Sequence, residues 1–214
     1  MLDFSAIKQL TVDGIDLKSL AINGVQVWKS GLLPAGYQQV ESIASTGSQY
    51  VVIPIGPTVS YVANLDIAFA KTGSRSLMGH GTAAGYYFGA TAAGLFELGG
   101  GVETKGVSAY PRQTITVENT SSYMTLKAEG YNQIKRSKGN GTSHTLRLLG
   151  GLSGVSCSAE LYGCVITSSD GTELYNLIPC YRTSDGKAGL YNLTNNEFLG
   201  SSGNSPLILG PEIN

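Results

Sequence analysis

Short runs rich in β-branched and aromatic residues recur along this chain, and almost no stretch has the periodicity of a helix. Turn pairs such as Gly-Ser, Gly-Thr, Asn-Gly and Asp-Gly separate the runs. Many short strands at this spacing are typical of a β-sandwich or barrel. The runs that we expect to form strands are 40–45, 49–55, 61–70, 86–90, 95–100, 114–119, 123–128, 144–150, 159–167 and 173–181. The sequence therefore predicts an all-β fold.

Two features give detail to this expectation. In QTITVENTSSYMTLKAEG, apolar residues alternate with polar ones, which predicts strands with one face in water. The stretch from Ser168 to Gly171 joins two long runs and is expected to be a hairpin turn.

The start of the chain contains one ten-residue pattern twice. KQLTVDGIDL is followed at once by KSLAINGVQV in the same register. Asp-Gly and Asn-Gly are strong short-range hairpin signals, so each copy is expected to fold into a hairpin. In the first hairpin Leu10 should pair with Leu17 and Val12 with Ile15, and the second copy should repeat this pattern.

A lone hairpin is only marginally stable in water, so the apolar residues of the repeat need a partner surface. We expect that surface to belong to another protein, and packing against the rest of the chain is the alternative. The expected assembly interface comprises Leu10, Val12, Ile15, Leu17, Leu20, Ile22, Val25, Val27 and Trp28. Residues 1–30 are thus predicted to be an attachment or oligomerisation module, residues 31–36 a linker, and residues 37–214 a larger β domain.

The chain carries few charges for its 214 residues. Lys and Arg total 14 and Asp and Glu total 15, which gives a net charge of -1. The charged fraction of 14% is well below the usual value of about 25%. This excludes a basic surface for nucleic acid, and no apolar run is long enough for membrane insertion. A polar, nearly neutral surface suits neutral glycans or self-assembly.

The cysteines point to neither a metal site nor a disulfide framework. Cys157, Cys164 and Cys180 lack zinc-binding spacing, so we expect no metal and no cofactor. Buried reduced thiols are the favoured interpretation. The first residues lack the basic and apolar regions of a signal peptide, so we expect synthesis in a bacterial cytoplasm.

Catalytic motifs are equally hard to find. A glycosidase needs two carboxyl groups across a cleft, and only Glu97 and Glu160 lie suitably in strand-like runs. No Gly-x-Ser-x-Gly elbow or metal-binding histidine motif is present. We therefore predict that the protein is not an enzyme, and a diverged glycoside hydrolase is the alternative.

Tyrosines favour binding instead. The sequence has 12 tyrosines, whose flat apolar faces and polar tips suit sugar rings and wet interfaces. In Tyr86-Tyr87-Phe88, at least one tyrosine should leave the core, because neighbouring residues on a strand face opposite sides. The residues expected to bind ligand are Tyr86, Tyr87, His80, Arg75 and Asn132.

Two stretches resemble a known group of proteins. LPAGYQQVESIASTGSQYV (33–51) is similar to the opening of a group of bacteriophage and prophage structural proteins, and LYGCVITSSDGTELYNLIPCYRTSDGKAGLYNLTNNEFLGSSG (161–203) is similar to their closing pattern. The repeat at the start also resembles short segments that open phage structural proteins. Where the group has Asp-Thr-Gly after the first motif, this chain has Pro54-Ile55-Gly56, which puts any site built on that aspartate in doubt.

The resemblance implies a concanavalin A-like, LamG-like jelly roll over residues 37–214. It also implies a virion protein, associated with a tail or fibre, that contacts other virion proteins, forms a homo-oligomer (a trimer by preference) and binds carbohydrate on the bacterial surface. Gly189-Leu190-Tyr191 and Phe198 would form a terminal hairpin that closes the sandwich. A purely structural assembly or capsid-decoration protein without a ligand is the alternative.

Overall fold

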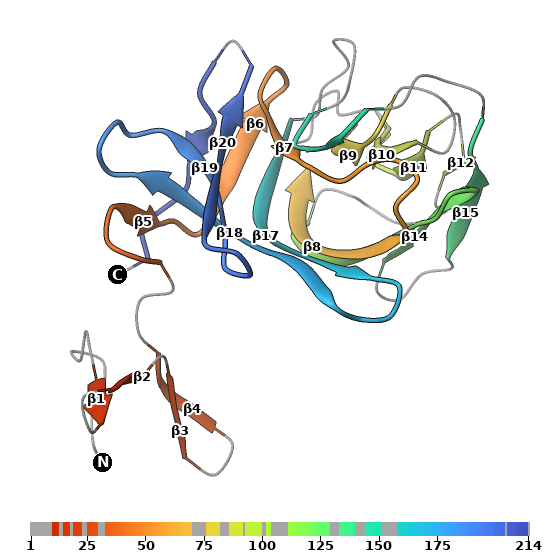
Figure 1. The fold of residues 1–214 in the computed structure, drawn as a ribbon. Helices are drawn as coiled ribbons and strands as arrows, with labels where there is room; N and C mark the ends of the chain where they lie inside the picture. Colours follow the sequence, from red (N-terminus) through yellow and green to blue (C-terminus); the bar gives the residue numbers. More distant parts are fainter. Residues whose placement is uncertain are drawn as a thin grey trace.

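The chain is all-β in this computed structural model, with twenty-one strands and no helix among the residues that it describes (Figure 1). The described residues are 10–12, 15–17, 19–22, 25–29, 33–69, 76–81, 86–91, 93–99, 102–103, 111–128, 133–139, 144–150, 158–203 and 205–213, with only the backbone described for 10–29 and 102–103. No helix in these ranges is long and apolar enough to cross a membrane.

Two small hairpins precede the larger domain. They are formed by β1 (Leu10–Val12) with β2 (Ile15–Leu17), and by β3 (Ser19–Ile22) with β4 (Val25–Lys29). In the first, Leu10 lies opposite Leu17 and Val12 opposite Ile15, as the Asp-Gly turn predicts. The predicted hairpins are therefore confirmed.

The second hairpin departs from the first at its open end. Ile22 lies opposite Val25, but Leu20 lies opposite Trp28, because the register shifts between Leu20 and Ala21. Val27 is the extra residue of a bulge in β4. The expectation that the second copy repeats the register of the first is wrong at this position. The role of the hairpins as an assembly interface stays a prediction.

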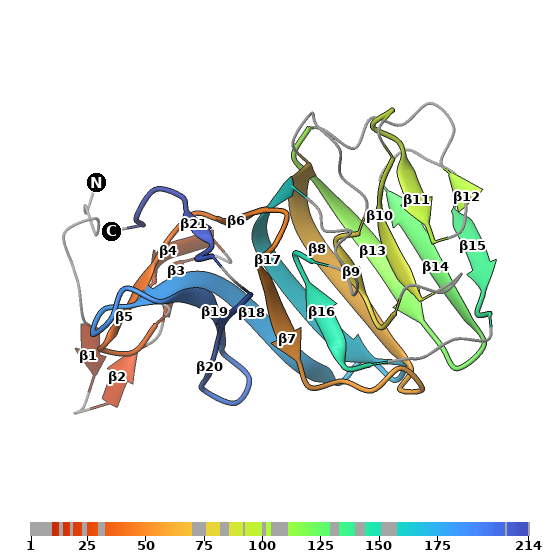
Figure 2. The same cartoon turned by 90° about the horizontal axis from the view of Figure 1, so that it is seen from above.

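The larger domain is built from two antiparallel sheets that pack face to face (Figure 2). The first contains β5 (Tyr37–Gln39), β6 (Ile43–Thr46), β8 (Tyr61–Phe69), β13 (Gln113–Asn119), β14 (Tyr123–Ala128), β15 (Ile134–Ser137), β17 (Ser158–Ser168), β18 (Glu173–Arg182), β19 (Ala188–Asn192) and β21 (Ile208–Leu209). The second runs in the order β12 (Val102–Glu103), β11 (Phe96–Leu98), β10 (Tyr87–Ala90), β9 (Met78–Gly79), β16 (Leu146–Leu148) and β7 (Tyr50–Ile53).

One strand connects the two sheets. β20 (Glu197–Ser202) pairs with β19 in the first sheet and with β7 in the second. The antiparallel structure is thereby nearly closed into a barrel. The two ends of the larger domain also lie together, since β21 pairs with β6 and Val40 bridges to Glu212.

The core lies between the sheets and follows the predicted alternation. Ile115 and Val117 on β13 and Met124 and Leu126 on β14 are all fully buried. Each of the ten predicted strand runs overlaps a strand, although the run 40–45 meets β6 only from Ile43 onward. The strands that the sequence did not predict include β9, β12, β15 and β21, of four residues or fewer, which are too short for a recognisable period.

The two described cysteines are buried free thiols. Cys164 lies opposite Leu177 and Cys180 lies opposite Gly189, so the two are not aligned across the β17–β18 ladder. Burial raises the pKa of both thiols to about 12. The preference for core thiols over a disulfide is confirmed for this pair, and Cys157 lies outside the described residues.

Candidate functional site

The candidate site begins at a fork beside β17. Along one edge of this strand, residues 158–161 pair with β6 and residues 164–167 pair with β18. Between these partners, Tyr162 and Gly163 pair with neither strand on that edge. The two neighbouring strands thus separate at this point and leave part of β17 uncovered.

A β-bulge lies at the same point. On the other edge of β17, the register with β8 shifts between Leu161 and Gly163. Both Tyr162 and Gly163 are partly exposed, while Leu161 and Cys164 on either side are buried. A bulge adds one residue and re-aims the side chains next to it, so Tyr162 is directed to the outer face of the sheet.

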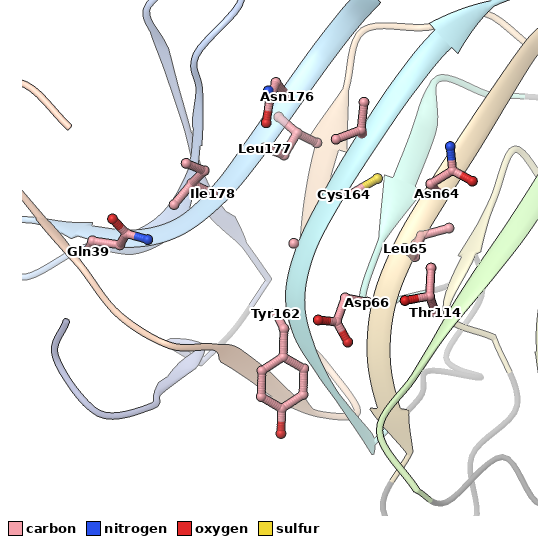
Figure 3. A pocket seen from close by; sticks show the side chains of 12 residues that line it. Gln39, Asn64, Leu65, Asp66, Thr114, Tyr162, Cys164, Asn176, Leu177 and Ile178 are labelled. Atoms are coloured by element: carbon pink, nitrogen blue, oxygen red, sulfur yellow. The ribbon is translucent and has the colours of Figure 1, made fainter. Parts of the chain in front are cut away.

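The fork holds an open groove of about 350 Å³ (Figure 3). Its lining comes from β5, β8, β13, β17 and β18, and contains Gln39, Asn64, Asp66, Thr114, Tyr162, Gly163 and Asn176 among other residues. Most of these side chains are amides, hydroxyls or a phenol, and Asp66 alone is a carboxylate. The remaining lining is apolar and comes from Leu65, Cys164, Val165, Leu177 and Ile178, so the groove combines polar side chains with a larger apolar surface.

Neighbouring residues orient the amides in the groove. The Thr116 hydroxyl donates a hydrogen bond to Oδ1 of Asn64 at 2.8 Å. The Asn64 amide nitrogen is therefore oriented as a hydrogen-bond donor. Asn176 donates from Nδ2 to Glu173 at 3.3 Å, which leaves its carbonyl oxygen as an acceptor. The groove thus offers both donors and acceptors.

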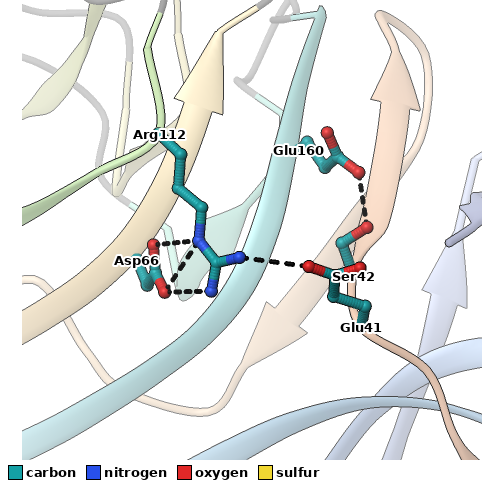
Figure 4. Close-up of polar contacts among 5 residues, drawn as sticks. All are labelled: Glu41, Ser42, Asp66, Arg112 and Glu160. Carbon is teal, nitrogen blue, oxygen red and sulfur yellow. Dashed lines mark hydrogen bonds and ion pairs between the residues drawn. The ribbon is translucent and has the colours of Figure 1, made fainter. Parts of the chain in front are cut away.

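Arg112 bridges Asp66, which lines the groove, and Glu41 (Figure 4). Arg112 binds Asp66 through Nη2 at 2.8 Å and through Nε at 3.1 Å, and its Nη1 lies 3.2 Å from Glu41 Oε1. Its guanidinium carbon also lies 3.7 Å from the ring centroid of Tyr162. Hydrogen bonding to Asp66 raises the pKa of Arg112, so the guanidinium stays charged and is shared by Asp66 and Glu41.

Tyr162 is fixed from a second side by Glu160. Burial and the hydrogen bond to Glu160 raise the pKa of Tyr162 to about 12. Glu160 in turn accepts a hydrogen bond from the Ser42 hydroxyl at 2.5 Å. The phenol is therefore neutral at physiological pH and is held between Glu160 and Arg112.

The predicted ligand residue His80 lies in the core. It is fully buried, with Nδ1 3.0 Å from the carbonyl oxygen of His144 and Nε2 3.1 Å from the hydroxyl of Tyr61. Both ring nitrogens have partners inside the protein. His80 is thus a core residue rather than a surface ligand.

The predicted tyrosines lie away from the groove. Tyr87 is on β10 in the second sheet, and Tyr86 precedes it; both are half-buried, whereas Phe88 is fully buried. The Lys138 ammonium lies 5.2 Å from the ring centroid of Tyr86. The expectation that a tyrosine leaves the core is confirmed, but their role in binding stays a prediction. Arg75 and Asn132 lie outside the described residues.

The two suspected catalytic acids lie on different sheets. Glu97 is on β11 between the buried Phe96 and Leu98, and Glu160 is on β17 between the buried Ala159 and Leu161. Each side chain therefore faces outward from its own sheet, with the core between them. They cannot act as a pair across one cleft. The described residues also contain no group of three His, Cys, Asp or Glu that could hold a metal ion.

The sequence did not single out Arg112, Asp66, Tyr162 or Asn64 as site residues. One signal was available, because Tyr162-Gly163 interrupts the alternation of an otherwise regular strand. A glycine within a strand often marks a bulge. The pairing of Arg112 with Asp66 and Glu41, which are 46 and 71 residues away, had no local signal.

Comparison with known proteins yields no family. No protein-family profile and no curated protein matches the chain. Among solved structures, Trypanosoma rangeli sialidase in complex with 2,3-difluorosialic acid aligns with a TM-score of 0.39 and 10% identity over 80% of this chain and 35% of that one. The same sialidase with the inhibitor DANA aligns with a TM-score of 0.39 and 10% identity over 74% and 34%.

These similarities are too low to carry an argument about fold or function. The chain also spans only about a third of the sialidase structures that it matches.

Proposed function

We propose that this chain is a bacteriophage virion protein, associated with a tail or fibre, that binds a neutral carbohydrate on the bacterial surface. The observation that carries the binding proposal is the groove at the β17 fork, with its amides, hydroxyl and Tyr162 ring. Its volume of about 350 Å³ is near the lower end of the ~300–1,000 Å³ range of small-molecule sites, which suits a short glycan segment.

The chemistry of the groove fits sugars better than most other ligands. Hydroxyl groups of a sugar both donate and accept hydrogen bonds, as Asn64 and Asn176 require. The Tyr162 ring offers an apolar surface for the C–H face of a pyranose. Asp66 is the one carboxylate in the lining and is paired with Arg112, which also binds Glu41, so the groove has no excess positive charge that would favour an anionic ligand.

The phage assignment rests on the two sequence motifs, and the finer fold assignment is part of the same proposal. We infer a concanavalin A-like jelly roll, supported by two face-to-face antiparallel sheets in which an early strand, β6, lies beside the last strand, β21. The protein would be made in the bacterial cytoplasm and incorporated into the particle with other virion proteins.

A steric block tests the binding proposal. A Cβ at Gly163 would meet only the Leu177 carbonyl oxygen, at 3.7 Å, so the position accepts a side chain. We expect Gly163→Trp to fill the groove and abolish binding on a glycan array and in calorimetry with host cell-wall fragments. Gly163→Ala is the matched control and should bind normally. Folded wild-type protein that binds no sugar at millimolar concentration would contradict the proposal.

A second candidate is an assembly or decoration protein without a ligand, most simply as a homotrimer. It rests on the two hairpins, which form their own two-stranded sheets apart from the larger one. Light scattering on the chain with and without residues 1–30 tests it. An unchanged oligomeric state would show that the hairpins are not the assembly element.

A further inference from the structure

The last described residues expose an unusual share of apolar surface. Four large apolar residues are exposed in the described part of the chain, and three of them lie close together in sequence: Ile208 at 53%, Leu209 at 38% and Ile213 at 45%. We call these three residues the C-terminal apolar segment. Exposed apolar residues that gather in one short segment are typical of an interaction site.

The same segment includes the edge of a sheet. β21 pairs with β6 along one side, and no described strand pairs with its other side. An apolar edge strand with unpaired backbone groups readily accepts another strand, and proteins usually cover or charge such an edge. The C-terminal apolar segment therefore presents an apolar surface and a strand edge that another strand could cover.

The chain also contains strands that need a partner. In β1 and β2 the residues Leu10, Val12, Ile15 and Leu17 occupy four of the six paired positions. Two-stranded hairpins are marginally stable alone in water. The described hairpins pair only within themselves.

A short tether brings these two surfaces within reach of each other. β4 ends at Lys29 and β5 begins at Tyr37. The segment between these two Cα atoms contains eight residue-to-residue steps and spans at most about 29 Å when fully extended. β5 lies directly beside the C-terminal segment, because the Ile213 amide donates to the Gln39 carbonyl oxygen at 3.0 Å. Figure 1 shows the C-terminus close to β5, where the chain enters the larger domain.

We propose that the N-terminal hairpins dock on the C-terminal apolar segment of their own chain, adding a strand beside β21. The tether favours the chain's own hairpins over those of a second copy, since short linkers give effective concentrations on the order of millimolar. Docking would cover Ile208, Leu209 and Ile213 and complete the exposed edge. This proposal is independent of the proposed carbohydrate binding.

Reciprocal substitutions in the full-length chain test the docking. Ile208→Asp places a charge in the C-terminal apolar segment, and we expect trypsin to cleave after Lys18 and Lys29 several-fold faster than in the wild type. Val59→Asp is the matched control, because Val59 is similarly exposed at 42% but lies in the turn before β8. It should leave cleavage at both lysines unchanged.

The reverse readout uses hydrogen exchange. Ile15→Asp in the first hairpin should raise amide exchange across residues 207–213 several-fold and leave β8 and β17 as they are. Equal cleavage in Ile208→Asp and wild type, or equal exchange in Ile15→Asp and wild type, overturns the proposal. Light scattering at increasing protein concentration distinguishes docking within one chain from docking between two copies. If residues 207–213 become protected from exchange only at concentrations where the mass also rises, the partner is a second copy and the proposal is overturned.

Discussion

Tyr61 and His80 join the two sheets through a hydrogen bond inside the core, with 3.1 Å between the Tyr61 hydroxyl and His80 Nε2. Tyr61 begins β8 in the first sheet, and His80 follows β9 in the second. His80 Nδ1 donates to the His144 carbonyl oxygen, so Nε2 of the neutral ring accepts from the tyrosine. Burial favours this neutral form of the imidazole.

This relationship predicts a loss of stability in acid. Burial lowers the pKa of His80 to about 4, below its ordinary value of 6.5. The unfolded chain therefore takes up a proton first, and the stabilisation present above pH 6.5 is lost as the pH falls to about 4. The loss amounts to about 3 kcal/mol. Urea unfolding of wild type and His80→Gln between pH 7 and pH 4 measures it, and identical pH slopes would contradict it.

Removing the tyrosine hydroxyl should also be costly. Tyr61→Phe leaves His80 Nε2 buried without its partner, which should lower the free energy of unfolding by about 1–3 kcal/mol. Tyr181→Phe is the matched control, because its hydroxyl bonds Glu212 at 2.7 Å in an exposed position. It should change stability by less than about 0.5 kcal/mol. Equal losses of unfolding free energy in the two variants would show that the buried hydrogen bond stabilises the protein no more than the exposed one.

Arg112 should matter for binding more than for stability. The side chains of Arg112 and Glu41 are 48% exposed and that of Asp66 is 35% exposed, so Arg112→Ala should cost under about 1 kcal/mol. It leaves Asp66 unneutralised and removes the cation from the Tyr162 ring. We expect weaker glycan binding in calorimetry, with Arg112→Lys recovering it only in part. Unchanged affinity in Arg112→Ala would place the ligand elsewhere.

Gly210 follows β21 and packs closely against Ser42 beside the candidate site. A Cβ there would lie 2.4 Å from Oγ of Ser42, the residue that bonds Glu160. Gly210→Ala should therefore destabilise the protein by about 1–3 kcal/mol. Gly56→Ala is the control, because a Cβ at Gly56 meets only Val59 at 4.0 Å. Thermal melts of both variants test the difference, and an unaffected Gly210→Ala would contradict the close packing.

The buried thiols should resist modification. Burial raises the pKa of Cys164 and Cys180 to about 12, so almost no thiolate forms near neutral pH. In a Cys157→Ser background, we expect no reaction with a thiol-specific reagent at pH 8 until urea unfolds the chain. Two thiols should then react together. Rapid labelling of the native protein would contradict the buried position of either cysteine.

Several elements of this protein follow from the sequence alone. The Asp-Gly turn specifies the register of β1 with β2, because a two-residue loop aligns the residues on either side of it. Ile115 and Val117 reveal the buried side of β13, because strand residues alternate between faces. These are local properties, and they were sufficient to predict an all-β chain and ten of its strands.

Tertiary structure decided the rest. His80 has no local feature that separates a buried histidine from a surface one, and only the packing of two sheets places it against Tyr61. Arg112 meets Asp66 and Glu41 because β8, β13 and the turn before β6 converge in space, far apart in sequence. The groove exists because β6 and β18 share one edge of β17 and separate at Tyr162. Strand order, rather than residue pattern, therefore determines which side chains form the site.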